Sequence, residues 1–356
     1  MPCDHEAVLQ ALAKDAQRPP SEARLASLDA TISQFASSEA LADKKIVARA
    51  LHDKVRALFD LQRPAEGARV LAELRARYAT AEPELRQWVC HAHFGAALGL
   101  KDAHKRIDAY AVILEIASVE PAIDHLAAEA LYNMGLCGRY LQPSDPLCVR
   151  SNDALRELER RFLASQQPRV AAWVAAGLAV LAGRSWPESQ EAAEIYERVV
   201  DAYGSATEEL QQHAVAALSD WGLRLMRRKL ELAVEVWDRS WARFRHLKTP
   251  AAQARLAGDR LNRAVALGTL QGVEAELAAY EELHRTFFDS PWPAVHRWVV
   301  AAAENHALVL RDEQRIEEAT RALERALDRF APATEPAELV QVVSKAQRLL
   351  AKLRES

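Results

Sequence analysis

The chain has 356 residues, of which 50% are hydrophobic, 27% charged and 6% aromatic, a composition typical of a globular protein with a substantial core. Its formal net charge of -4 gives no sign of the basic surface that nucleic-acid binding requires, so no nucleic-acid partner is expected. The longest near-apolar run, 170–182, is too short to cross a bilayer, and no membrane partner is expected either.

The cysteines and the N-terminal residues predict a cytoplasmic protein. The spacing of Cys3, Cys90, Cys137 and Cys148 fits neither a disulfide framework nor a paired metal-binding motif, and reduced thiols are typical of the cytoplasm. The first residues lack a basic stretch followed by an apolar run, which is the pattern of a secretion signal.

Pairs of apolar or aromatic residues seven positions apart recur about every 42 residues along the chain. Seven residues make two helical turns, so each pair lies on one face of a helix. A period of this length, sustained over eight copies, is the signature of stacked helical hairpins. No segment has the alternating pattern of a strand. The pairs are Leu28/Phe35, Leu71/Tyr78, Tyr110/Ala117, Leu155/Phe162, Tyr196/Tyr203, Trp237/Phe244, Tyr280/Phe287 and Leu323/Phe330.

Capping residues and prolines separate these helices, because proline at the first helical position loses no hydrogen bond. Examples are Thr80–Pro83, Thr249–Pro250 and Ser290–Pro291. The sequence therefore predicts an all-α solenoid over 1–356, with about eight stacked antiparallel hairpins and a C-terminal capping helix. The expected N-terminal hairpin spans 4–36, the seven hairpins of 40–330 span 40–79, 84–118, 122–165, 168–203, 208–246, 250–288 and 293–330, and the capping helix spans 335–353.

The segment 142–152 interrupts this regular spacing. Its sequence, Gln-Pro-Ser-Asp-Pro-Leu-Cys-Val-Arg-Ser-Asn, predicts the longest helix-poor connection of the chain. A connection of this kind can be a hinge, a binding loop or a simple insertion. We therefore treat 142–152 as an irregular segment and a candidate hinge.

Several helices resemble those of a known repeat family. Ala128–Gly135, Ala-Glu-Ala-Leu-Tyr-Asn-Met-Gly, resembles the first helix of a tetratricopeptide repeat, and 188–200, 231–237 and 316–327 resemble its second helix. The resemblance covers about 40–353, although the period is longer than the 34 residues usual in that family. It implies a right-handed α-solenoid that acts as a non-enzymatic scaffold or adaptor, binding a protein or peptide partner in its concave groove without a cofactor.

Polar residues recur two positions before Gly95, Gly135 and Gly222 in the predicted first helices, and at matching positions elsewhere. In the family that the chain resembles, this position faces the concave groove, where a polar side chain can hydrogen-bond the backbone of a ligand. The alternative is a row of simply solvated polar positions. The fourth hairpin has Ala175 or Ala176 in this slot. The predicted partner-binding residues are Asp53, His93, Asn133, Asp220, Asn262, Asn305 and Arg348.

Tryptophan and histidine positions add three further expectations. Trp292 lies between two prolines, where an indole is hard to bury, so it is a candidate partner anchor, with packing on its own helix as the alternative. Trp237 and Trp241 are one turn apart, which favours the core. The run Cys90–His93 has no four-ligand spacing, so structural packing is favoured over a metal site.

The chain contains no nucleotide-binding, zinc-protease or serine-hydrolase motif, so no enzyme is predicted. One competitor is a peptide- or ligand-sensing regulator that closes on its ligand and controls a partner effector. The other is an enzyme of an unfamiliar helical type, which needs a buried polar cluster. The sequence identifies neither the partner nor the oligomeric state.

Overall fold

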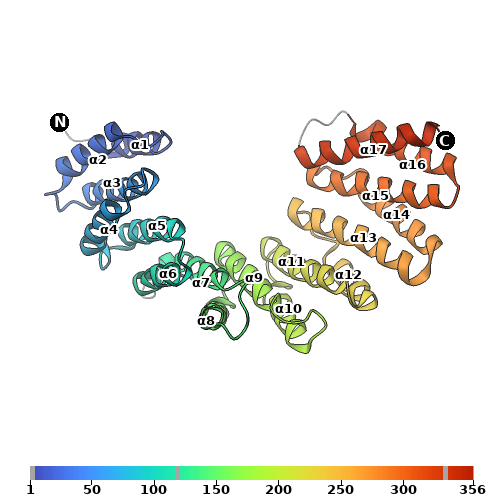
Figure 1. Cartoon of the computed structure of the whole chain (residues 1–356), viewed down its shortest axis with the longest axis horizontal. Coiled ribbons are helices and arrows are strands. Elements are labelled where there is room, and N and C mark those ends of the chain that lie inside the picture. The colour runs from blue at the N-terminus through green and yellow to red at the C-terminus, as the bar shows by residue number, and fades with distance from the viewer. Residues whose placement is uncertain (1–4, 118–120, 332–335, 356) are drawn as a thin grey trace. The chain divides into compact units, whose positions relative to one another are not determined.

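The computed structural model describes residues 5–117, 121–331 and 336–355. Within these residues it contains 17 α-helices, one 3-10 turn at Pro121–Ile123 and no strand, which confirms the all-α prediction (Figure 1). None of the described helices is long and apolar enough to cross a membrane. The helices form two compact units, Met1–Val180 and Leu181–Ser356, and the boundary falls near the end of α9.

The helices of the first unit match the expected hairpins. The segment of the predicted N-terminal hairpin contains α1 and α2, which both pack on α3, and the later segments each contain a first and a second helix. The helices are α1 (His5–Asp15), α2 (Glu22–Phe35), α3 (Leu41–Asp60), α4 (Pro64–Tyr78), α5 (Pro83–Gly99), α6 (Ala103–Ala117), α7 (Asp124–Cys137), α8 (Pro146–Phe162) and α9 (Pro168–Ala182).

The second unit continues the same alternation. Its last helix lies where the capping helix was predicted. Position 335, where that helix was expected to begin, lies outside the described residues. Cys3 lies outside them as well. The helices are α10 (Gln190–Tyr203), α11 (Glu208–Leu225), α12 (Leu230–Phe244), α13 (Pro250–Gln271), α14 (Val273–Phe287), α15 (Pro293–Asp312), α16 (Ile316–Phe330) and α17 (Ala337–Glu355).

Helices pack on their neighbours in chain order, so each unit is a repeat-like array. In the first unit, α3 contacts α4 and α5, and α5 contacts α6 and α7. In the second unit, α11, α13, α15 and α17 contact one another in succession, while α12, α14 and α16 each contact the two of them that flank it in the chain. We call α3, α5, α7, α9, α11, α13 and α15 the first helices, and α4, α6, α8, α10, α12, α14 and α16 the second helices.

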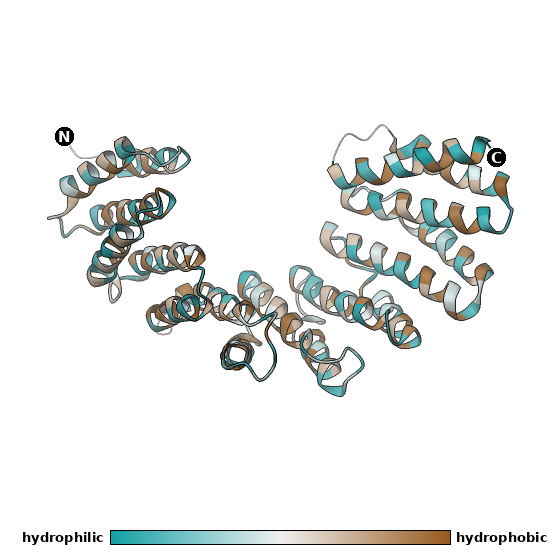
Figure 2. Cartoon of the chain, in the orientation of Figure 1, coloured by the Kyte–Doolittle hydropathy of each residue, from teal (hydrophilic) through white to brown (hydrophobic). Residues whose placement is uncertain are grey.

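The recurring apolar pairs form the core between helices. Every member is buried except Leu71, which is half-buried because Leu74, one turn later on α4, takes the core position beside Tyr78. Figure 2 shows the resulting alternation of hydrophobic and hydrophilic residues along helices such as α16. The prediction that Trp237 and Trp241 belong to the core is confirmed for Trp237, whose side chain is fully buried, whereas Trp241 is half-buried.

Small residues on two first helices allow the second helix of the same hairpin to approach closely. A Cβ atom added at Gly135 would lie 2.3 Å from Leu155 Cδ2, and one at Gly222 would lie 2.3 Å from Trp237 Nε1. Leu155 and Trp237 are members of the recurring pairs, so the glycine of the first helix receives the apolar residue of the second. In contrast, an added Cβ at Gly95 would meet nothing within 4 Å.

The predicted helix-poor segment 142–152 is shorter in the structure. Helix α8 begins at Pro146, and the Asp145 side chain caps it by accepting a hydrogen bond of 2.7 Å from the Leu147 amide. An aspartate followed by proline is a signal for the start of a helix, but the other polar residues of the segment 142–152 are typical of a loop. Helix α15 begins at Pro293, which is also the first residue of the predicted hairpin 293–330.

Candidate partner-binding surface

The structure places the three predicted residues of the first unit at different depths. Asp53 on α3 and His93 on α5 are buried, with 4% and 7% of their surface exposed, and Asn133 on α7 is half-buried. Burial lowers the pKa of His93 to about 4, and its Nε2 has no hydrogen-bond partner within the described part of the chain. The Asn133 side-chain amide donates to the Glu129 carbonyl oxygen, one turn earlier, at 2.9 Å.

Asp53 lies beneath His52, its neighbour in the sequence. One carboxylate oxygen is 3.0 Å from His52 Nδ1, and the other is 3.7 Å from Arg49 Nε. A carboxylate that accepts from Nδ1 orients the imidazole and leaves Nε2 for a ligand. The geometry therefore lets the buried Asp53 orient the half-buried His52, and that Asp53 itself binds a partner stays a prediction.

Four half-buried side chains on α3 and α5, which we call the His–Trp patch, contact one another across the two helices. They are Arg49, His52, Trp88 and His91. The His52 ring lies 5.3 Å from Trp88 and 6.4 Å from His91, and the Trp88 and His91 rings lie 6.0 Å apart. Arg49 lies over the Trp88 ring, with Cζ 5.1 Å from its centroid. Each helix contributes residues three positions apart, which share one helical face.

Ring and charged side chains continue from the His–Trp patch onto α7 and α9. The Tyr132 and Trp173 rings lie 5.0 Å apart, and Arg169 lies 3.7 Å from the carboxylate of Glu129.

The pKa of His91 also reflects this continuity. Burial, and to a smaller extent the charges of His52, His125 and Arg169, lower it to about 4. His91 is thus a neutral ring at pH 7, where it can stack and donate or accept one hydrogen bond.

Sequence reasoning missed the His–Trp patch. His52 and Trp88 were not singled out, and His91 entered only through the Cys90–His93 run. The usable signal is the repeated spacing of three between a long or aromatic side chain and a histidine, in Arg49–His52 and Trp88–His91. Such pairs are distinguishable from core residues only once the neighbouring helix is placed.

In the second unit, two predicted residues contact buried tyrosines of second helices. Asp220 on α11 accepts a hydrogen bond from the Tyr196 hydroxyl, and Asn305 on α15 hydrogen-bonds the Tyr280 hydroxyl. Burial raises the pKa of both phenols, so they remain protonated donors. Asp220 thus satisfies the buried Tyr196 hydroxyl, whereas the Tyr280 hydroxyl also donates to Glu276 Oε1 at 2.8 Å on its own helix, so Asn305 is its second partner.

The other predicted residues of the second unit differ in exposure. Asn262 on α13 is half-buried, whereas Arg348 on α17 is exposed and donates from Nε to the Ser344 carbonyl oxygen at 3.2 Å. Ala175 and Ala176, the predicted gap, are half-buried on α9. That these positions bind a partner stays a prediction.

Tryptophan exposure differs from the sequence expectation. Trp292 is half-buried and is the N-cap residue of α15. The more exposed indole is Trp186, which precedes α10, has 62% of its surface exposed and carries the Arg228 guanidinium 4.0 Å above its ring. Trp186 lies in Ser185-Trp186-Pro187, a connection between helices in which the tryptophan is next to proline, as it is at Trp292.

No set of three or more histidine, cysteine, aspartate or glutamate side chains in the described residues is arranged to hold a metal ion. Cys90 and Cys148 are buried, Cys137 is half-buried, and all three are thiols. The His–Trp patch offers groups that can recognise a ligand. They are three ring faces, the Arg49 guanidinium and the His52 imidazole, whose Nδ1 contacts the Asp53 carboxylate and whose Nε2 is left for a ligand.

Comparisons with known proteins do not assign the chain to a family. No family model matches it, and no curated protein matches it. A crystal structure of an engineered protein is similar at 17% identity and a TM-score of 0.39, over 98% of this chain and 95% of that one. A likeness this weak carries no argument about the fold or the function.

Proposed function

We propose that both units are built from tetratricopeptide-like hairpins of right-handed winding, about eight in the chain and followed by a capping helix. The protein would be a non-enzymatic scaffold or adaptor that binds a peptide segment of a protein partner. The main binding surface would be the His–Trp patch and its continuation on α7. Asn133, Asp220, Asn262 and Asn305 would add weaker contacts on their own helices.

The half-burial of the His–Trp patch carries this proposal. Its rings contact one another across α3 and α5, yet they are not sealed in the core, where the recurring apolar pairs already fill the space between helices. Aromatic and arginine side chains dominate the binding energy of protein interfaces because they bury a large area with little loss of rotamer freedom. Neutral histidine and indole N–H groups suit the backbone carbonyls of a peptide.

Charge around the patch favours a peptide of mixed polarity. Arg49 and Arg169 are cationic, while Asp53 and Glu129 each lie within 4.0 Å of one of them. Burial raises the pKa of Glu129, and Arg169 opposes that rise. Since no single sign of charge dominates, we expect ring stacking to contribute more to affinity than ionic attraction, and the dependence on salt to be shallow.

Selection of peptides from a random displayed library on the full chain tests the proposal. We expect enriched peptides whose affinity, measured by fluorescence anisotropy, falls about tenfold or more with Trp88→Ala, since a central interface tryptophan typically contributes at least that much. Tyr140→Ala is the matched control, because Tyr140 is an exposed ring of the same unit in the turn after α7. Peptides that bind Trp88→Ala as tightly as the unchanged protein would rule out the His–Trp patch.

The same selected peptide distinguishes a scaffold from the alternative function, a ligand-sensing regulator. A sensor that closes on its ligand would become more compact, and small-angle scattering with and without the selected peptide would detect the decrease in radius of gyration. A scaffold would bind without that change.

A further inference from the structure

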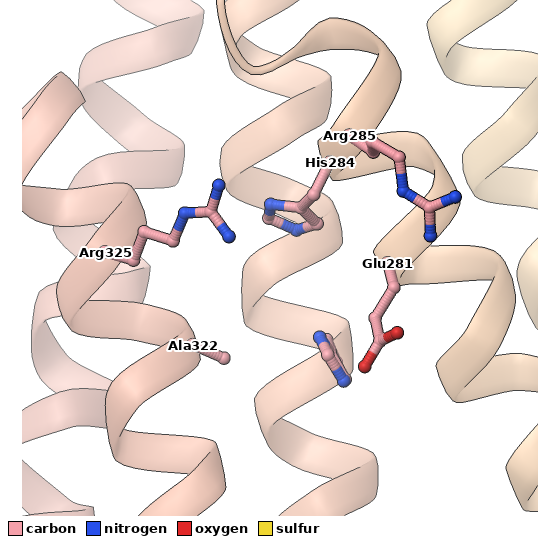
Figure 3. Close-up of a pocket in the computed structure, with 6 residues that line it drawn as sticks. Glu281, His284, Arg285, Ala322 and Arg325 are labelled. Atoms are coloured by element: carbon pink, nitrogen blue, oxygen red, sulfur yellow. The ribbon is translucent and has the colours of Figure 1, made fainter.

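A polar cleft lies between α14, α15 and α16 of the second unit, with a volume of about 320 Å³. Figure 3 shows it with His284, Arg285 and Glu281 contributed by α14 and Arg325 by α16. His306 of α15 and Ala322 of α16 complete the lining. The cleft therefore collects donors from three separate helices, and none of its lining residues belongs to the His–Trp patch.

His284 has a buried nitrogen that lacks a partner. Its side chain is 8% exposed, and Nε2 makes no hydrogen bond among the described residues. A buried nitrogen of this kind costs stability unless a ligand or water satisfies it. Figure 3 shows Arg325 extending toward His284 from the opposite helix.

The two arginines of the cleft form no ion pair with any residue that the structure describes, in contrast to the nearby Arg315. Arg315, on the adjoining surface, pairs with Glu318 at 2.8 Å and with Glu274 at 3.2 Å. Arg325 instead lies over the Phe288 ring, with Cζ 4.8 Å from its centroid. A guanidinium supported by a ring keeps its N–H groups free for an anion.

The charges of the lining sum to an excess of positive charge. Arg285 and Arg325 face one carboxylate, that of Glu281. Burial lowers the pKa of His284 to about 4, and burial also lowers the pKa of His306, so both rings are neutral hydrogen-bonding groups at pH 7.

We propose that this cleft binds a phosphoryl group, carried by a small ligand or by a phosphorylated side chain. Its donors approach from α14 and from the facing α16, so they match the oxygens of a tetrahedral anion better than the planar fork of a carboxylate, which a single arginine satisfies. His284 Nε2 gains the partner that it lacks. Glu281, at the edge of the cleft, weakens the attraction and limits the affinity.

Calorimetry on the full chain with inorganic phosphate and with O-phosphoserine tests the site. We expect dissociation constants of about 1 mM or lower, and no binding of serine, which has the same carrier without the phosphoryl group. Tighter binding of O-phosphoserine than of phosphate would point to a phosphorylated side chain, and equal affinities to a small ligand. Absence of binding of both probes at about ten times that concentration would overturn the proposal.

Matched variants separate the site from general charge effects. Arg325→Gln is expected to weaken phosphate binding about tenfold, the loss of one charge-assisted hydrogen bond. Arg321→Gln removes the same charge one turn earlier on α16, from a residue outside the cleft lining, and is expected to change the affinity less than about twofold. Equal losses in the two variants would mean nonspecific attraction and would overturn the site.

Two further variants report on the remaining groups. His284→Leu fills similar space without a donor and is expected to weaken binding about fivefold or more, while Glu281→Gln is expected to tighten it because a like charge is removed. Trp88→Ala should bind phosphate as the unchanged chain does. A failure of the peptide-binding proposal would therefore leave this one standing, and the reverse also holds.

Discussion

The first and second units use the same hairpins, but they differ in what lies between successive first helices. At the position three residues before the predicted partner-binding residue, the first unit has Ala50, Cys90 and Ala130, all buried and small. The second unit also has small buried residues at this position on α11 and α15, Ala217 and Ala302, but it has Asp259 there on α13. Both oxygens of Asp259 lie within 2.7 Å of the Ser219 hydroxyl on α11. The second unit therefore adds one buried polar pair, between α11 and α13, to the apolar contacts that both units share.

The same difference extends to the charged side chains. In the second unit, the buried Arg260 pairs with Asp238 on α12 and with Glu282 on α14, and Arg263 also pairs with Asp238. Its polar groups thus hold helices together, as Asp220 does with its tyrosine. In the first unit, Arg49 and its ring neighbours contact one another at a half-buried surface. Polar residues engaged in internal contacts are less available to a partner, so the comparison favours the first unit as the binding region.

The largest effect of a change in packing is expected where the two units agree, at the glycine that receives the second helix. Gly222→Ala places a Cβ within 2.8 Å of three Trp237 ring atoms, and the fully buried indole has no space to move. Overpacking costs about 1–3 kcal/mol, whereas alanine restores about 1 kcal/mol of helix propensity. Because the added Cβ meets three atoms of a rigid ring, we place the cost at the upper end of that range, about 3 kcal/mol, and expect a net loss of about 2 kcal/mol in the free energy of unfolding, measured by chemical denaturation.

Two matched glycines sharpen this test. Gly135→Ala meets Leu155, a side chain with more rotatable bonds than an indole, so its loss should be smaller, about 1 kcal/mol. Gly95→Ala meets nothing within 4 Å, and helix propensity alone should stabilise it by about 0.5–1 kcal/mol. If all three changes had the same effect, the close approach of the two helices would not be the cause.

The comparison of these glycines shows which part of the fold the sequence could predict, namely the helix face that lies in the core. A seven-residue interval identifies the helix face in the core, because that face is repeated along the chain and must be apolar in every hairpin. The other faces are not fixed in this way. His52 and Asp53 are adjacent in the sequence, yet one borders the patch and the other is buried beneath it, since consecutive residues project about 100° apart around a helix. Which of them is accessible depends on how closely the next first helix approaches.

Alignment on small residues was therefore too coarse to locate the accessible side chains. It placed His93 where α5 presents His91 and Trp88 instead. Arg285 and Arg325 lie on successive second helices 40 residues apart, close to the repeat interval, but that interval does not tell that their side chains line one cleft. Pairing across helices follows from packing distance and side-chain length, which periodicity does not contain.

A separate effect, on the pH dependence of stability, is expected at the polar pair of the second unit. Burial raises the pKa of Asp259 to about 7, against the lowering influence of the Ser219 hydrogen bond and of Arg255. Between the usual carboxyl pKa and 7 the folded state holds a proton that the unfolded state has lost. Stability from this group therefore falls as pH rises from about 4 to 7, by at most about 1.4 kcal/mol per pH unit.

Asp259→Asn removes this dependence while keeping the shape of the side chain. Histidines such as His91 and His284 have pKa values lowered to about 4, so they make the protein less stable as pH falls below 6.5. Because this effect has the opposite direction, the test must use the difference in stability between Asp259→Asn and the unchanged protein. We expect the stability of the variant relative to the unchanged protein to grow from pH 4 to 7 and to level off above it, as measured by denaturation at each pH. A constant difference would mean that Asp259 is ionised throughout.

The smallest expected effect is on partner affinity in the second unit. Asn262→Ala combined with Asn305→Ala should weaken binding of the selected peptide only about two- to threefold, because Asn305 already hydrogen-bonds Tyr280 and one of the two amides is thus engaged within the protein. Its loss should appear instead as about 1 kcal/mol of stability, the usual contribution of one hydrogen bond. Asn262→Ala alone separates the two effects, since its consequence for stability should be smaller.

Unchanged affinity would remove the row of polar residues from the binding surface of this unit. A tenfold loss, equal to that expected for Trp88→Ala, would show that internal contacts do not keep a side chain from a partner, and the difference between the two units would then lie in packing alone.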